Sequence, residues 1–271
     1  MCSGCAHAQS AINMVDRTSL EAGKSLQICA DLEALSLAAA KRFTDLAAQA
    51  IGKRGAFHVA LAGGATPRRL YQHLATPMFA ERIAWQHVHI YFGDERAVPP
   101  DDPDSNYLMA YEALLRHVPI PEARIHRING AEKDLSHSAT DYERVLRQQL
   151  TASDGLFPQF DLVLLGIGPD GHVASLFPDT PILKETSRLV AAVYVAKLFT
   201  WRISLTLPLI NNARHIMVLA AGENKTDIIR QVFIDDASSD HYPVQLLHPA
   251  GELEWYLDAA AARTLADGAL A

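Results

Sequence analysis

The chain has 271 residues, 49% of them hydrophobic and 20% charged, which supplies a sizeable core and excludes a wholly disordered protein. Its 24 basic and 31 acidic residues give a net charge of −7. That charge argues against a general nucleic-acid binder, which needs a basic face to displace phosphate counterions, but it leaves room for a local basic pocket for a small anion.

The sequence predicts a loose tail at residues 1–18 and one domain at residues 19–265, in which we find no repeat or linker. Within the domain, apolar runs of strand length alternate with segments of helical periodicity. In chain order we expect a helix at 28–51, a strand at 57–62, a helix at 67–74, a strand at 87–92, helices at 105–116 and 141–150, strands at 161–165, 189–195 and 215–220, a helix at 223–233, a strand at 242–247 and a closing helix at 252–262.

Near-continuous apolar strands that alternate with helices indicate an α/β fold, with an open, mostly parallel sheet and helices on both faces. Such sheets bind ligands beyond the carboxyl ends of their strands, where the strand order reverses. Polar residues follow several predicted strands at that position. They lie in the turns Gly63-Gly64-Ala65-Thr66, Gly93-Asp94-Glu95-Arg96, Gly166-Ile167-Gly168-Pro169-Asp170-Gly171-His172 and Gly222-Glu223-Asn224-Lys225.

The loop at residues 166–172 is the most distinctive of these turns, because three glycines surround Asp170 and His172. His172 is a natural general base near neutral pH, and Asp170 can orient it or bind substrate. A purely structural role for His172 is the alternative. His58, His87 and His89 lie within predicted strands and are expected to be structural.

The run Asp94-Glu95-Arg96 follows another predicted strand. Arg96 can bind a carboxylate or phosphate through two parallel hydrogen bonds, or stabilise an oxyanion. Asp94 can act as a base, hold a sugar hydroxyl or pair with Arg96. The alternative is a surface loop joined by a salt bridge. Downstream, Ser105 is expected to cap a helix.

The Gly63-Gly64 turn precedes a predicted helix whose first residue is Pro67. Glycines let backbone N–H groups approach an anion, and the helix dipole adds positive charge. Thr66 adds a hydroxyl, either for a ligand or as the helix N-cap, and an ordinary strand–helix turn is the alternative. Arg202 and Lys225 are further cations for such a ligand, although either alone is typical of a solvated surface.

Other chemistries lack their motifs, since the sequence has no H-E-x-x-H, no paired C-x-x-C, no G-x-S-x-G and no G-x-G-x-x-G after the first predicted strand. Cys2 and Cys5 precede every predicted element, so we expect no redox or metal role for them, whereas Cys29 is expected in the core. No apolar run approaches about 18 residues, and the first residues lack signal-peptide order, so a cytoplasmic location is predicted.

Taken together these segments resemble the 6-phosphogluconolactonase family. The matching stretches are GGATP at 63–67, YFGDERAVPPDDPDSNY at 91–107, LGIGPDGHVASLFP at 165–178 and RISLTLPLINNARHIMVLAAGENK at 202–225, and the likeness spans residues 19–262. Glucosamine-6-phosphate deaminases share the Thr-Pro turn and the Asp-Gly-His loop. They typically have Asp-Glu-Tyr in place of Asp94-Glu95-Arg96, and Ile-Ala-Phe-Asn-Glu-Pro in place of residues 173–178. Both differences favour the lactonase, although Ala62 and Ala65 occupy positions that are often serine there.

The resemblance implies a Rossmann-like fold similar to that of the deaminases, and hydrolysis of 6-phospho-D-glucono-1,5-lactone to 6-phosphogluconate in the oxidative pentose phosphate pathway. It implies that His172 takes the proton of water, that Asp170 orients His172 or contacts the sugar, and that Arg96 stabilises developing charge. Asp94 would hold Arg96 or a sugar hydroxyl. The phosphate would be held by Gly63, Gly64, Thr66, Arg202 and Lys225.

No metal or organic cofactor is implied. The expected partner is a small sugar-phosphate lactone, without nucleic acid or membrane, and the chain is expected to be a monomer or a weak homo-oligomer. Two rival functions remain open. An aldose–ketose isomerase or deaminase would use the same pocket, and a non-catalytic sugar-phosphate sensor would share the fold, although the chain has no basic helix-turn-helix segment.

Overall fold

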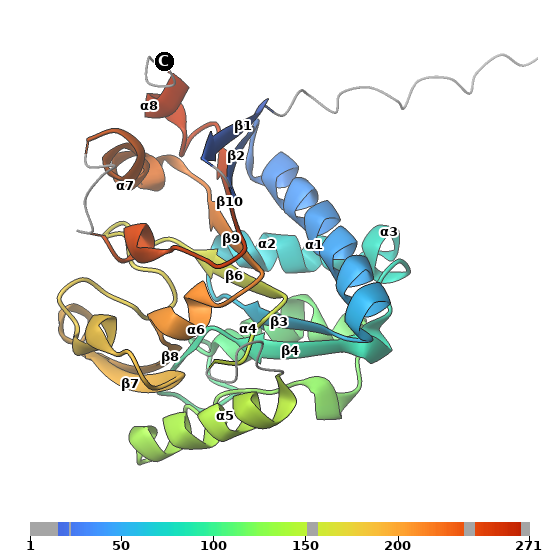
Figure 1. The fold of residues 1–271 in the computed structure, drawn as a ribbon, viewed down its shortest axis with the longest axis vertical. Helices are drawn as coiled ribbons and strands as arrows, with labels where there is room; N and C mark the ends of the chain where they lie inside the picture. Colours follow the sequence, from blue (N-terminus) through green and yellow to red (C-terminus); the bar gives the residue numbers. More distant parts are fainter. Residues whose placement is uncertain (1–15, 22, 151–156, 236–241, 267–271) are drawn as a thin grey trace, which may run out of the picture.

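A computed structural model describes residues 16–21, 23–150, 157–235 and 242–266. Its centre is a seven-stranded sheet in the order β1-β2-β10-β9-β6-β3-β4 (Figure 1). Every neighbouring pair in this sheet is parallel except β1 with β2. The predicted open, mostly parallel sheet is therefore confirmed. Its strands are β1 (Asp16–Glu21), β2 (Lys24–Cys29), β3 (Phe57–Leu61), β4 (Val88–Phe92), β6 (Leu162–Gly166), β9 (His215–Ala220) and β10 (Glu252–Asp258).

A small antiparallel sheet lies beside the large one and has the order β5-β8-β7, with β5 at Asp94–Arg96, β8 at Thr200–Leu205 and β7 at Val190–Val195. The sequence predicted β7 but treated β5 as a loop and did not predict β8 as a strand. In the β5–β8 pair, Arg96 stands directly opposite Arg202. The small sheet therefore joins two candidate site residues that are far apart in the chain.

Helices cover both faces of the large sheet, as predicted. Figure 1 shows α1 on one side of the strands and α7, α6 and the small sheet on the other. The longer helices are α1 (Leu32–Arg54), α2 (Ala65–Leu74), α4 (Asn106–Ala113) and α5 (Leu135–Gln149), and the shorter ones are α3 (Pro77–Ala80), α6 (Leu207–Asn211), α7 (Thr226–Arg230) and α8 (Arg263–Ala266). Further 3-10 turns lie at Trp85–His87, Leu115–His117, Glu122–Arg124, Pro181–Lys184, Ala196–Leu198, Glu223–Lys225 and Pro243–Leu246, and a π-helical turn at Gln231–Asp235.

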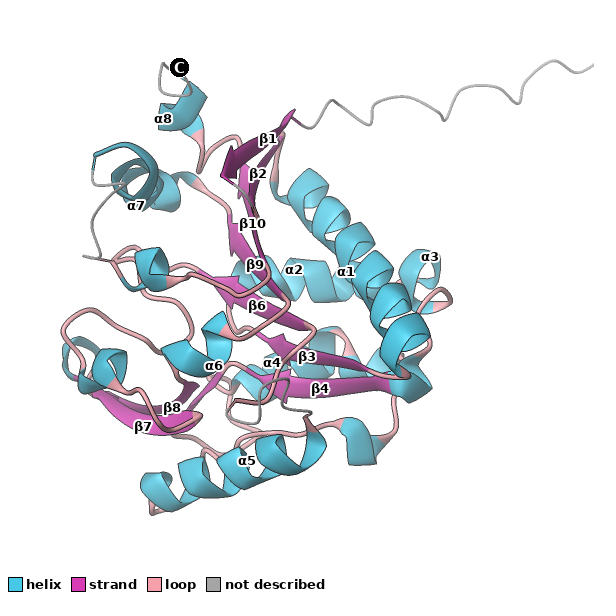
Figure 2. Cartoon of the chain, in the orientation of Figure 1, coloured by secondary structure: helices cyan, strands magenta, loops and turns pink. Residues whose placement is uncertain are grey.

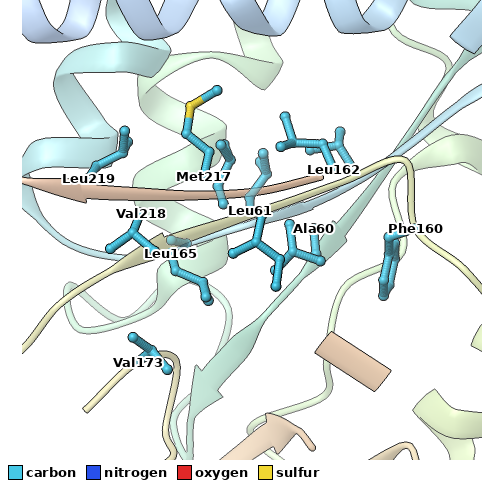
Figure 3. Packing of buried hydrophobic residues seen from close by; sticks show 14 of the residues in the cluster. Ala60, Leu61, Phe160, Leu162, Leu165, Val173, Met217, Val218 and Leu219 are labelled. Carbon is cyan, nitrogen blue, oxygen red and sulfur yellow. The ribbon is translucent and has the colours of Figure 1, made fainter. Parts of the chain in front are cut away.

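The core is built on the central strands β3, β6 and β9, whose side chains are buried on both faces of the sheet. Figure 3 shows Met217 and Leu219 of β9 pointing to one side and Val218 to the other. Burial on both sides explains why these strands are near-continuous apolar runs in the sequence. Cys29 is also buried, as expected, whereas Cys2 and Cys5 lie outside the described residues.

Two predictions near the C-terminus are wrong. The segment predicted as a closing helix, 252–262, begins with strand β10, which lies between β2 and β9 (Figure 2). Its Glu254 and Asp258 are buried, so polar residues interrupt the apolar pattern of an interior strand. Glu254 pairs with Arg42 of α1, and Asp258 accepts hydrogen bonds from two backbone N–H groups, which offsets the cost of burying them. The segment 242–247, predicted as a strand, forms a 3-10 turn.

The N-terminal boundary also differs from the prediction. Strand β1 begins at Asp16, inside the range given to the tail, and residues 1–15 lie outside the described part of the chain. The helix predicted from Ile28 begins at Leu32, because Ile28 belongs to β2 and Asp31 caps the helix by accepting a hydrogen bond from the Ala34 backbone N–H. The single-domain interpretation stays a prediction.

The strand order reverses between β3 and β6. From β3 the chain passes to β4 at one edge of the sheet, whereas from β6 it passes to β9 on the opposite side. The carboxyl ends of β3 and β6 therefore open a crevice, which is where ligands bind in sheets of this type. Among the described residues, no helix is both long and apolar enough to cross a membrane.

Candidate active site

A cavity of about 520 Å³ lies at the carboxyl ends of β3, β6 and β9, within the usual range for small-molecule sites. Residues from all four glycine turns predicted from the sequence line this cavity. Of the nine candidate site residues, eight line it directly: Gly63, Gly64, Thr66, Asp94, Arg96, His172, Arg202 and Lys225. Asp170 stands behind His172 and contacts it through its carboxylate.

The loop after β6 holds His172 by two contacts. Asp170 Oδ1 lies 2.5 Å from His172 Nδ1, and the imidazole stacks on the Phe177 ring with centroids 4.0 Å apart. A carboxylate can only accept, so Nδ1 carries the proton and Nε2 keeps its lone pair. A Cβ on Gly168 would lie 1.9 Å from His172 Nδ1, so only glycine allows this close approach.

Burial lowers the pKa of His172 to about 4, since the charged imidazolium loses its hydration. Asp94 acts in the opposite direction, whereas Lys225, Arg202 and Arg96 add to the lowering. His172 is therefore neutral at physiological pH and can accept a proton at Nε2.

The 3-10 turn Pro243–Leu246 supports this loop from behind. The Val244 backbone N–H donates to the Gly171 carbonyl at 3.0 Å, and a Cβ on Gly171 would lie 2.7 Å from Tyr242 Cβ. A segment far along the chain thus fixes the backbone beside His172, which sequence reasoning did not foresee.

The Asp94–Arg96 run is a buried strand rather than the alternative surface loop. Asp94 and Glu95 are only 7% and 2% exposed. The Glu95 carboxylate accepts from the backbone N–H groups of Asn106 and Tyr107, which ties β5 to the start of α4. Ser105 caps α4, as expected, by accepting from the Leu108 backbone N–H.

Of the two alternatives given for Asp94, holding Arg96 or a sugar hydroxyl, the structure does not show the first. The Asp94 carboxylate accepts from Ser175 Oγ at 2.7 Å and from Asn106 Nδ2 at 3.2 Å, and no ion pair joins it to Arg96 in the part of the chain that the structure describes. Arg96 instead donates to the Asp104 carbonyl. Its guanidinium is therefore not neutralised by the adjacent carboxylate.

Arg96 and Arg202 face each other across neighbouring strands and both line the cavity. Like charges at opposed positions repel, and burial together with Arg96 lowers the pKa of Arg202. The buried Nε atoms of both arginines have no hydrogen-bond partner among the described residues. Two partly buried cations with unused donors in one cavity indicate a binding site for an anion.

The Gly63-Gly64 turn leads into the N-terminus of α2. The helix begins at Ala65 and its N-cap is Gly64, so Thr66 is not the cap and Pro67 is the third helical residue, which corrects that prediction. Thr66 lies at the cavity instead. A Cβ on Gly63 would lie 1.9 Å from Asn106 Oδ1, so α4 packs against this turn.

Sequence reasoning missed Asn106 and Ser175 as parts of the site. Both are nearly fully buried, line the cavity and hold Asp94. Asn106 follows the cap Ser105 directly, and Ser175 lies three residues after His172, so their place within the matched motifs was the available signal. Lys197 was also missed, and no sequence motif marks it.

The fold and site together define an α/β protein with a cationic acid–base pocket at a topological switch point. A profile of the family described as glucosamine-6-phosphate isomerases/6-phosphogluconolactonase matches residues 30–255. The chain belongs to this family.

Among its relatives, a 6-phosphogluconolactonase from a Synechocystis species is 42% identical over 80% of this chain and 88% of its own length. The enzyme of that name from Haemophilus influenzae is 38% identical over 77% of this chain and 87% of its own length. A solved 6-phosphogluconolactonase structure from Trypanosoma cruzi covers 89% of this chain and 96% of its own, with a TM-score of 0.78 and 30% identity. A monomeric glucosamine-6-phosphate deaminase, 23% identical with a TM-score of 0.73, shares the fold.

Proposed function

We propose that this chain hydrolyses 6-phospho-D-glucono-1,5-lactone to 6-phosphogluconate, with His172 as the general base. Relatives named 6-phosphogluconolactonase match this chain over most of their own length. This match supports the proposed substrate and its place in the pentose phosphate pathway. The observation that carries the residue assignment is the convergence of one neutral histidine with Arg96, Arg202 and Lys225 on a single cavity.

The reaction adds water to the ester carbonyl at C1 and breaks the bond from C1 to the ring oxygen. His172 Nε2 takes a proton from the attacking water, and the imidazolium then returns it to the departing ring oxygen. Asp170 holds the imidazole through Nδ1 and stabilises its charged form. Arg96 stabilises the oxyanion that forms on the carbonyl oxygen, and the carboxylate that follows. Asp94, held by Ser175 and Asn106, is positioned for a sugar hydroxyl.

The phosphate is assigned to the turn before α2. The first backbone N–H groups of a helix have no carbonyl partner within it, and its dipole favours an anion there. Gly63, Gly64 and Thr66 present this turn to the cavity, while Arg202 and Lys225 supply positive charge from β8 and from the turn after β9. Ala62 and Ala65 supply no hydroxyl, so backbone donors carry more of the binding.

Product analysis tests the proposal. The purified chain is given the lactone and, separately, glucosamine 6-phosphate, and acid release and ammonia release are followed, with spontaneous lactone opening subtracted. We expect acid release from the lactone alone. Ammonia release from glucosamine 6-phosphate without acceleration of lactone opening would favour the deaminase instead. A cytoplasmic location and a monomeric or weakly associating state remain part of the proposal.

The activity is expected to be lost only at strongly acidic pH. Because the pKa of His172 lies at about 4, the base stays unprotonated through neutral and mildly acidic pH, and kcat/KM should fall only as the pH passes down through about 4. A fall centred at the ordinary histidine pKa of about 6.5 would contradict this. Burial also lowers the pKa of His58 and His89 to about 4, so unfolding must be separated by returning samples to neutral pH and measuring recovered activity.

Replacing Lys225 by alanine is expected to raise KM by about 10-fold or more while kcat changes little, because a phosphate remote from the reacting carbon is bound equally in the ground and transition states. Burial lowers the pKa of Lys225, which indicates an ammonium partly withdrawn from water, and Lys225 lines the cavity. Steady-state kinetics check this, with the exposed Lys41→Ala on α1 as matched control. A lower kcat at unchanged KM would place Lys225 at the reacting end.

A further inference from the structure

The turn between β7 and β8 belongs to the small sheet, but it contacts the loop after β6 that holds His172. It consists of the 3-10 turn Ala196–Leu198 followed by Phe199, whose φ of 49° is left-handed. Leu198 lines the active-site cavity. The neighbouring Lys197 places its ammonium against Asp170 Oδ2, where the two form an ion pair.

Lys197 contacts both groups that hold His172. Asp170 uses Oδ1 for His172 Nδ1 and Oδ2 for Lys197. The Lys197 ammonium also lies 4.7 Å from the centroid of the Phe177 ring, and Phe177 stacks on the His172 imidazole. These contacts form a closed set of four side chains drawn from the loop after β6 and the β7–β8 turn.

We infer that Lys197 is a positioning residue for lactone hydrolysis, which holds the Asp170 carboxylate with one oxygen directed at His172 Nδ1. The inference rests on the proposed role of His172 as the base. A carboxylate with a single partner can rotate, whereas a cation on the second oxygen fixes its plane and favours its ionised form. Lys197 then acts on catalysis through Asp170 and not by touching substrate.

The proposed effect of Lys197 on catalysis does not act through the stability of the fold. The Lys197 side chain is 48% exposed, and ion pairs of such exposure contribute little to folding, so its variants should remain folded. Other charged groups act on His172 from other elements: Asp94 and Arg96 from β5, Arg202 from β8 and Lys225 from the turn after β9. Loss of Lys197 leaves the full carboxylate charge of Asp170 acting on the imidazole.

Lys197→Met is expected to lower kcat by about 10-fold with a smaller change in KM, as for other groups that orient a reacting side chain. It should also move the acidic limb of the kcat/KM profile to higher pH, because the uncompensated carboxylate stabilises the imidazolium. Lys197→Arg should restore most of kcat, since it returns the charge. Lys184→Met, an exposed lysine at the end of the 3-10 turn Pro181–Lys184, is the matched control and should change neither quantity.

A double-mutant cycle with Asp170→Asn gives the decisive measurement. If Lys197 acts through Asp170, Lys197→Met should have almost no further effect on kcat in the Asp170→Asn background. Losses that multiply, a rise in KM alone, or a pH profile unchanged in Lys197→Met would overturn the inference. His172→Asn is assayed in parallel. Full activity in that variant would refute the proposed base, whereas an inactive His172→Asn beside a normal Lys197→Met would refute only the role of Lys197.

Discussion

Replacement of His172 by asparagine is expected to lower kcat for the lactone by about 10²- to 10⁴-fold, the usual contribution of general acid–base catalysis. The asparagine amide can still donate a hydrogen bond to Asp170, as Nδ1 does, but it carries no basic nitrogen in place of Nε2. Binding should change less than turnover, because the cations at the cavity remain. Lactonase kcat and KM, corrected for spontaneous opening, measure both effects.

The matched control is His137→Asn on α5, where the imidazole side chain is 59% exposed and pairs with the exposed Asp141. It should leave kcat unchanged. Circular dichroism and thermal unfolding establish that both variants fold. Near-normal turnover in folded His172→Asn protein would contradict the assignment of His172 as the general base, whatever the activity of the control.

Replacement of Arg96 by methionine is expected to lower kcat by about 10²- to 10³-fold, as for a lost oxyanion donor. Arg96 lines the cavity with a buried, unpartnered Nε and is not neutralised by Asp94. It also stands opposite Arg202, so its removal relieves repulsion between two cations and should not destabilise the fold through lost pairing.

Arg96→Lys should keep part of the activity, since lysine retains the charge but not the planar set of donors. Arg116→Met, at an exposed position in the turn Leu115–His117, removes the same charge away from the cavity and should have no effect. The comparison of kcat among the three variants is the measurement. Full activity in Arg96→Met would remove its catalytic role and reopen the deaminase interpretation, in which a phenol occupies this position.

Much of the fold was predictable because its central strands are buried on both faces. Segments such as 161–165 and 215–220 are therefore near-continuous apolar runs, and the glycine turns that follow them mark the edge where sheets of this type bind ligands. The same rule predicted that His172, Arg96, Arg202 and Lys225 lie near one edge of the sheet. In the structure all four line one cavity.

Strand β10 was not predictable from local pattern. Its buried Glu254 and Asp258 look like solvent-facing residues of a helix until Arg42 and the backbone N–H group of Gly222 are seen to partner them. Local propensity cannot register a partner more than 200 positions away in sequence.

The sequence by itself determined the α/β class, the glycine turns at the carboxyl edge of the sheet and the candidate acid–base and cationic residues, because each depends on residues close together in the chain. Only the tertiary structure decided how those residues are connected. It assigned Asp94 to Ser175 and Asn106 instead of Arg96, opposed Arg96 to Arg202, and brought Lys197 to Asp170. These contacts join separate strands and loops, and they form only when the two sheets pack together.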